Sequence, residues 1–211
     1  MVIHPGPVGA LFPGFDGFSF GANNFVEHLA ERICDFNLAK RGSPDQFIGS
    51  ARMIAAREHQ RCGFRDIIEM DPKTFELKIL KYVVVHDCGT VINPMILAGQ
   101  IHGGVAQGIG NAFYEKLVFD DQGQLLNASL ADYLLPTALD VPRMELAHTV
   151  TKSPLNPMGI KGAGEAGAIP GGPLFAQAIE DALDLKRRSV ELLETPLSPS
   201  RLFELTRNAR T

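Results

Sequence analysis

The residue best suited to chemistry is Glu165, the only acid in a stretch from Ser153 to Pro173 that is rich in glycine, proline and small apolar residues. This much glycine and proline excludes a regular helix or a central strand. The apolar residues scattered through it predict a buried loop, and loops of this kind often carry function. A carboxylate held among small apolar groups would lose hydration, which is how proteins tune an acid into a general base.

Two glutamines form a second candidate group. Gln100 and Gln107 are seven residues apart in a segment from Pro94 to about Lys116, whose apolar spacing predicts a helix. Seven residues are two helical turns, so both amides should face one side. That side is either a solvated face or a binding face. Five glycines lie in the helix, and each should cost up to about 1 kcal/mol against alanine unless close packing or a ligand requires it: Gly99, Gly103, Gly104, Gly108 and Gly110.

Other familiar motifs are weak. Residues 162–167 read G-x-G-x-x-G, but no strand immediately precedes them and Pro170 stops a helix from beginning there, which argues against a dinucleotide-binding turn. The histidines show no close pairing, and no serine lies in a nucleophile-elbow motif. The aspartates are better explained by turns and caps than by a metal, so we assign no metal ligand within the chain.

Composition limits the function classes. The chain has 211 residues, 45% hydrophobic and 21% charged, and a net charge of −4, which disfavours nucleic acid or an anionic membrane as partner. No apolar run approaches the roughly 20 residues of a membrane span. An odd, widely spaced set of cysteines argues against disulfides and against cysteine-bound zinc or iron–sulfur clusters, and favours a reducing cytoplasm: Cys34, Cys62 and Cys88.

The predicted class is α+β, with helices packed on mixed or antiparallel strands after a poorly ordered N-terminal arm. We divide the chain into an irregular or helical segment, residues 1–63, and a second domain, residues 64–211. Helices are expected at 25–40, after Ser43 or Asp45, at 94–116, at 173–188 and after the N-cap Ser198. Strands are expected at 64–71, 75–86 and 144–151, with a hairpin around 120–123.

Several separated motifs occur in the order and spacing of a known family. They are Asp87-Cys88-Gly89, Ile92-Asn93-Pro94, the run Gly99 to Gly104, Gln107-Gly108, Asp132-Tyr133, Pro136 and Lys161 to Glu165. Together they resemble the C-terminal part of the molybdopterin-binding large subunit of molybdenum hydroxylases. That family includes xanthine dehydrogenase, aldehyde oxidase and the aerobic carbon monoxide dehydrogenases. The resemblance runs from about residue 76 to 186.

The resemblance implies a role for each matching position. Glu165 corresponds to the glutamate beside the molybdenum that acts as the catalytic base. The helix and loop would help to bind a molybdenum–pterin cofactor, either molybdopterin or molybdopterin cytosine dinucleotide, through Gln100, Gly103, Gly104, Gln107, Lys161, Gly162 and Gly164. The implied reaction is oxidative hydroxylation of an aldehyde, an N-heterocycle or a similar small substrate, or oxidation of carbon monoxide.

Partner chains are implied as well. FAD and [2Fe-2S] clusters are expected on separate flavin and iron–sulfur subunits, because this chain lacks the cysteines for them. The family's large subunit is several times longer, and its other cofactor-contacting segments have no counterpart here. The chain is therefore either one part of a split large subunit, inactive without the other part, or a truncated fragment that binds no cofactor alone.

Overall fold

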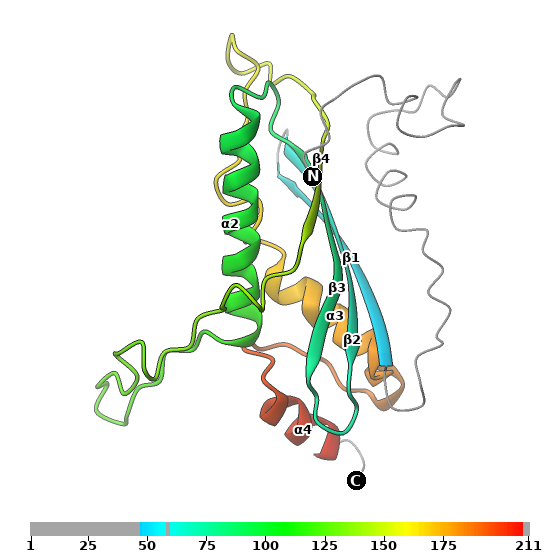
Figure 1. The fold of residues 1–211 in the computed structure, drawn as a ribbon, viewed down its shortest axis with the longest axis vertical. Coiled ribbons are helices and arrows are strands. Elements are labelled where there is room, and N and C mark those ends of the chain that lie inside the picture. Colours follow the sequence, from blue (N-terminus) through cyan, green and yellow to red (C-terminus); the bar gives the residue numbers. More distant parts are fainter. Residues whose placement is uncertain (1–46, 58–59, 209–211) are drawn as a thin grey trace.

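The computed structural model describes residues 47–57 and 60–208. The predicted N-terminal arm and the predicted helix at 25–40 lie outside these residues. In chain order the elements are β1 (Phe47–Arg57), β2 (Gln60–Met70), β3 (Leu77–Asp87), α2 (Pro94–Phe113), β4 (Met144–His148), α3 (Gly171–Ala182), a short 3-10 helix η2 (Leu185–Arg188) and α4 (Pro199–Asn208). Strands and helices alternate irregularly along the chain, so the α+β prediction is confirmed (Figure 1).

One mixed sheet organises the molecule. Its order is β1-β2-β3-β4, with antiparallel pairing except between β3 and β4, which are parallel. The turn between β2 and β3 is held by Asp71, whose carboxylate accepts the Lys73 backbone N–H at 2.7 Å. In the first half of β3, half-buried positions alternate with exposed ones. Its second half, from Tyr82 to Asp87, is buried. The predicted strands and the turn between them are confirmed.

The helix expected after Ser43 or Asp45 is wrong, because residues 47–57 form β1. The apolar spacing in this segment supports a helical face only weakly. β2 offers an antiparallel partner along the full length, from Phe47 opposite Met70 to Arg57 opposite Gln60. Ladder hydrogen bonds to that partner therefore decide the conformation over local preference. The boundary expected between residues 63 and 64 falls inside β2.

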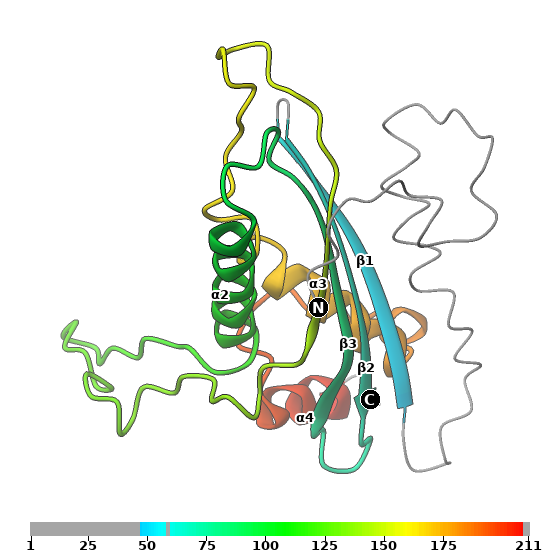
Figure 2. The ribbon, with the colours of Figure 1, turned by 45° about the horizontal axis from the view of Figure 1, so that its top comes forward.

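Helix α2 begins as its sequence predicts. The Asn93 side chain accepts the backbone N–H groups of Met95 and Ile96, and Pro94 occupies the first turn, where its missing N–H does no harm. The inner face buries aliphatic residues against the core: Leu97, Ile101, Val105 and Ile109. Figures 1 and 2 show α2 beside the sheet and α3 crossing behind the strands.

The core lies between the sheet and the helices. Phe175 of α3 is fully buried, and its ring lies 5.9 Å from the ring of Tyr82 on β3 and 4.8 Å from that of Phe113 on α2. These offset aromatic contacts join sheet, α2 and α3 into one hydrophobic cluster. The predicted C-terminal helix is also present as α4, with the Ser198 hydroxyl accepting the Arg201 backbone N–H at 3.3 Å.

A long arm, residues 115–143, extends from the body between α2 and β4 (Figures 1 and 2). Its reversal around Asp120–Gly123 is present, with a single bridge between Phe119 and Leu125 and no regular strands. Two tyrosine hydrogen bonds fasten its base: Tyr133 Oη to Glu115 at 2.7 Å and Tyr114 Oη to Asp140 at 2.9 Å. Leucines along the arm are solvent-exposed: Leu126, Leu130, Leu134, Leu135 and Leu139. No helix among the described residues is long and apolar enough to cross a membrane.

Glycines bring α2 and α3 into backbone contact. A Cβ at Gly171 would lie 2.5 Å from the Gly108 carbonyl oxygen, and one at Gly167 would lie 2.5 Å from that of Ile101. A Cβ at Gly104 would in turn lie 3.0 Å from Gly167 Cα. The close packing expected of the helix glycines is therefore confirmed at Gly104 and Gly108.

We predict that Gly171→Ala lowers the free energy of unfolding by about 1–3 kcal/mol, because its methyl group can be accommodated only by moving one backbone away from another. Denaturant unfolding of the full chain measures the change. Gly172→Ala is the matched control, since its Cβ would meet only the Thr195 methyl group at 3.3 Å. Equal stability of the two variants would contradict this account of the α2–α3 contact.

Candidate functional site

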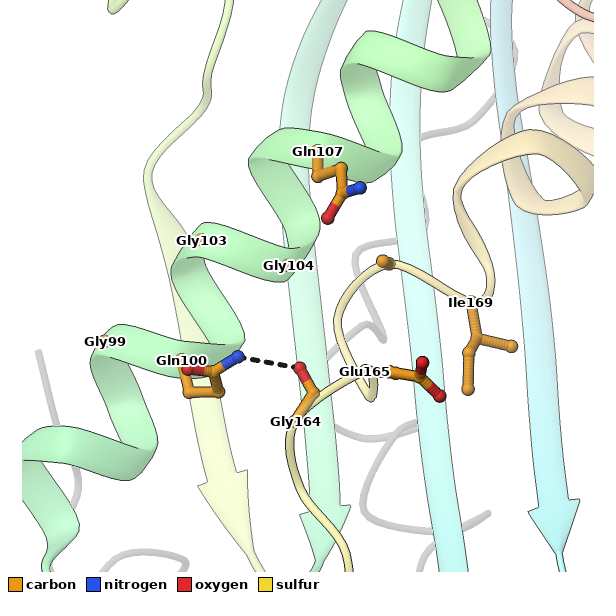
Figure 3. Close-up of a pocket in the computed structure, with 9 residues that line it drawn as sticks. Gly99, Gln100, Gly103, Gly104, Gln107, Gly164, Glu165 and Ile169 are labelled. Carbon is orange, nitrogen blue, oxygen red and sulfur yellow. Dashed lines mark hydrogen bonds between the residues drawn. The ribbon is translucent and has the colours of Figure 1, made fainter.

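A cleft of about 440 Å³ lies between α2 and the glycine-rich loop. Gly99, Gln100, Gly103, Gly104 and Gln107 line it from the helix, and the loop contributes Gly164, Glu165, Ala168 and Ile169 (Figure 3). Gln100 and Gln107 do face one side, as their spacing predicts. Six of the eight predicted site residues thus meet in one place, although they come from segments about 60 residues apart.

A single side-chain hydrogen bond links the two walls of this cleft. The Gln100 Nε2 group donates to the carbonyl oxygen of Gly164 at 2.8 Å (Figure 3). Gly164 immediately precedes Glu165, so this bond fixes the backbone beside the carboxylate. The Glu165 carbonyl oxygen also accepts the Ala168 backbone N–H at 3.1 Å, which closes a tight turn after it.

The carboxylate of Glu165 is exposed, which corrects the expectation of a buried acid. The reason is local: the residues around it are glycine and alanine, which have almost no side chain with which to cover it. The small residues bring the loop close to α2, but they leave the cleft open on the side of the carboxylate. The described residues therefore leave this carboxylate in contact with water.

The helix glycines serve two different purposes. Gly104 and Gly108 face inward and pack on the backbone of the loop and of α3. Gly99 and Gly103 are exposed, line the cleft, and would place a Cβ where no atom lies within 4 Å. Packing within the chain therefore does not explain these two residues, although each costs the helix up to about 1 kcal/mol. Gly164, across the cleft, is open in the same way.

Lys161 and Gly162 do not line this cleft. The Lys161 ammonium is buried and lies 3.0 Å from an Asp87 carboxylate oxygen and 2.6 Å from the Thr151 hydroxyl. Sequence reasoning missed Asp87 and Thr151 as partners of the loop. An acid directly after the buried end of a strand was the available signal, but nothing in the spacing identified its partner.

The chain is similar in sequence and fold to several known proteins. Residues 65–142 match the family model described as a molybdopterin cofactor-binding domain. The chain is similar to the carbon monoxide dehydrogenase large chain of Hydrogenophaga pseudoflava, with 45% identity over 55% of this chain and 14% of the relative. It is also similar to the nicotine 6-hydroxylase large subunit of Paenarthrobacter nicotinovorans, with 41% identity over 67% and 17%. The crystal structure of quinoline 2-oxidoreductase from Pseudomonas putida 86 superposes with a TM-score of 0.65, 42% identity, and coverage of 70% and 19%.

The described part of the chain is homologous to a fragment of the molybdopterin-binding large subunit of molybdenum hydroxylases. The family resemblance expected from the motifs is thereby confirmed. The chain spans less than a fifth of the length of each of these relatives.

The lining of the cleft is compatible with one side of a molybdopterin. The pterin is a flat, polar ring system, and two carboxamides on one helical face can hydrogen-bond to its edge. Gly99, Gly103 and Gly164 would let such a ring approach the backbone directly. Within residues 47–57 and 60–208, no group of three or more histidine, cysteine, aspartate or glutamate side chains could hold a metal ion. The residues present thus fit one side of the pterin group and supply no metal cage.

A second cleft adjoins the first. It has a volume of about 490 Å³ and shares Gln100 and Gly164 with the first cleft. The rest of its lining is polar at Thr90, Asn93 and Lys161 and otherwise apolar: Cys88, Val91, Ile92, Ile96, Leu97, Ile160 and Ala163. The Gln100–Gly164 hydrogen bond therefore lies between a cleft of mixed polarity and a more apolar one, a division that periodicity could not predict.

Buried polar groups lie behind the loop, at the end of the sheet. His86 is fully buried and opposite His148 in the parallel β3–β4 pair. Burial first, and the nearby His148 second, lower the pKa of His86 to about 4. Burial alone would raise the pKa of Asp87, but hydrogen bonds from Thr151, Gly89 and Lys161 outweigh it and hold that pKa below its usual value.

We predict that acid destabilises the chain through His86. Its folded pKa lies below the ordinary value of 6.5, so the unfolded chain binds the proton more readily. The stabilisation is therefore complete above about pH 6.5 and is lost as the pH falls toward 4, by a total of about 3 kcal/mol. Thermal unfolding midpoints between pH 7.5 and 4.5 measure this loss.

The matched comparison uses two histidine variants. His86→Gln should reduce the pH dependence, whatever its effect on stability at pH 7.5, and leave the part that comes from His148, whose pKa burial also lowers. His102→Gln, at an exposed position on α2, should leave the dependence unchanged. A wild-type slope in the His86 variant would show that another group carries the acid sensitivity.

Proposed function

We propose that this chain forms one wall of the molybdopterin site in a molybdenum hydroxylase and that Glu165 is its catalytic base. One observation carries the proposal. Two amides and a carboxylate from separate segments converge on a cleft whose outer helix glycines, Gly99 and Gly103, have no packing role within the chain. A cleft shaped this way suits a flat polar group that approaches the helix closely.

Each residue would have a distinct task in that site. The molybdenum–pterin group, as molybdopterin or its cytosine dinucleotide, would supply the redox chemistry of an oxidative hydroxylation. Gln107 and Gln100 would hydrogen-bond to the pterin, Gly103 and Gly164 would admit it to the backbone, and Gly104 would hold the loop against the helix. Lys161 and Gly162 would act through the conformation of the loop. Glu165, which lines the cleft, would take up the proton released as the substrate is hydroxylated.

The proposal includes partner chains. We infer that the remainder of a large subunit covers the exposed carboxylate of Glu165 and the exposed leucines of the arm. Closing the cleft would exclude water and give Glu165 the low-polarity surroundings that a general base requires. Iron–sulfur and flavin subunits would carry the electrons away. Proposed substrates are small aldehydes, N-heterocycles or carbon monoxide.

We predict that Glu165→Gln in the assembled complex lowers kcat by at least about 10²-fold, because the amide cannot accept the proton. Molybdenum content and subunit composition should stay at wild-type levels, since the replacement keeps the size of the side chain. Glu204→Gln, an exposed change on α4 far along the chain, is the control and should retain full activity. Substantial turnover by the Glu165 variant would remove this residue from the chemistry.

We predict opposite effects of filling Gly103 on stability and on cofactor content. Gly103→Ala should raise the free energy of unfolding of the chain by up to about 1 kcal/mol, because alanine favours the helix and meets no atom. The same change should lower the molybdenum content of the purified complex, and Gly103→Leu should lower it further. Both are measured directly, by unfolding and by metal analysis.

His102→Ala is the matched control, since His102 is exposed on the same helix but does not line the cleft. It should leave molybdenum content unchanged. Normal molybdenum in both Gly103 variants would place the pterin elsewhere. If the wild-type chain contains no molybdenum even with its neighbouring subunits, a non-catalytic fragment becomes the better hypothesis.

A further inference from the structure

A buried ion pair joins the end of β3 to the start of the loop that carries Glu165. Lys161 Nζ lies 3.0 Å from Asp87 Oδ2, and both side chains are less than one tenth exposed, at 7% and 3%. The Thr151 hydroxyl lies between them: it accepts from Lys161 Nζ at 2.6 Å and donates to Asp87 Oδ2. Three segments separated by up to 74 residues therefore meet at one carboxylate.

The backbone around this pair is clamped as well. The Lys161 N–H donates to the Cys88 carbonyl at 2.8 Å, and the Thr90 N–H donates to the Gly159 carbonyl at 3.1 Å. Gly89 has a φ of +68°, and a Cβ there would lie 2.1 Å from the Gly159 oxygen. The turn after β3 and the segment before Glu165 are thus pressed together at a distance that only glycine allows.

Further anchors hold the loop downstream. Gly164 is bound through its carbonyl to Gln100, and Gly167 lies against the backbone of α2. Between the Lys161 anchor and Glu165 the sequence is Gly-Ala-Gly, which has little side chain to pack and a flexible backbone. The Lys161 anchor and the Gln100–Gly164 hydrogen bond therefore fix the two ends of this tripeptide.

A buried ion pair is by itself weak evidence of a role in stability. Replacing a buried pair by apolar residues of similar volume is often neutral or stabilising, because both charges must be desolvated. What a directional pair adds is a defined geometry. Asp87 accepts hydrogen bonds from Gly89, Thr151 and Lys161 at once, which fixes its carboxylate, and the Lys161 ammonium is in turn held by Asp87 and Thr151.

We propose that Asp87, Thr151 and Lys161 form a positioning triad that sets the path of the loop at residues 162–168 and thereby the placement of Glu165. The placement role rests on the proposed function of Glu165, whereas the control of the loop does not. Lys161 acts through the loop because its ammonium group is engaged by Asp87 and Thr151, and because it does not line the cleft that contains Glu165. None of the three touches the reacting atoms, so they are positioning residues.

Hydrogen exchange of the full chain tests the triad. Lys161→Met keeps the length of the side chain and removes the charge, so amides of residues 162–168 should exchange about tenfold faster or more, as expected for a loop that opens locally. Peptides from the middle of α3 should keep their wild-type rates. Lys81→Met is the control, because it breaks a more exposed pair, with Glu145 at 3.3 Å, between β3 and β4. It should leave residues 162–168 unchanged.

Two outcomes would overturn the proposal. One is unchanged exchange at 162–168 in Lys161→Met, and the other is equal acceleration throughout the chain, which indicates a role in global stability only. Should Lys161→Met not fold, Asp87→Asn removes the opposite charge while keeping an oxygen acceptor. It should give the same localised acceleration, and uniform acceleration would again refute the triad.

Kinetics of the assembled complex separate this proposal from the proposed function. Lys161→Met should lower kcat at unchanged KM and unchanged molybdenum content, at temperatures well below unfolding. If Glu165→Gln remains active while Lys161→Met loosens residues 162–168, the proposed base is wrong and the positioning triad stands. If Glu165→Gln is inactive while Lys161→Met exchanges and turns over like wild type, the base stands and the triad is wrong.

Discussion

The structure depends on backbone-to-backbone contact between α2 and the loop that leads into α3. Gly167 and Gly171 approach the helix so closely that even one methyl group at either position would meet main-chain atoms at about 2.5 Å. This contact brings the loop against the helix over two successive turns, at Gly104 and Gly108. Dispersion contacts and the aromatic cluster around Phe175 then stabilise the arrangement. The loop can lie this close to α2, and so form the cleft between Gln100 and Glu165, only because the residues in contact are glycines.

The same helix separates structural from functional glycines by their orientation. Gly104 and Gly108 face inward, where neighbouring backbone atoms leave no room for a side chain. Gly99 and Gly103 face open space, so they weaken the helix without allowing any close contact within the chain. Sequence periodicity could predict the helix and the common face of Gln100 and Gln107, because both follow from 3.6 residues per turn. It could not divide the glycines into two classes, because that division depends on what packs against each face.

Two other features could not be predicted from the sequence, each for its own reason. Residues 47–57 were predicted as helix because their local pattern is weak, and their strand conformation depends on pairing with β2. The Asp87–Lys161 pair spans 74 positions, a separation on which neither composition nor periodicity carries information. The loop itself was predictable as an irregular functional segment, since glycine and proline exclude regular structure locally. Its anchors are long-range contacts and emerged only from the fold.

The exposure of Glu165 connects these points. The loop can lie close to α2 only because its residues are small, and small residues cannot shield a carboxylate from water. Tight approach and desolvation are therefore competing demands on one short segment, and this segment meets only the first. In the proposed function a second surface would meet the other demand, and the exposed leucines of the arm are apolar area that such a surface could cover. The glycines that bring the loop against α2 are also the reason that Glu165 is exposed, so the tight approach and the open carboxylate have one physical cause.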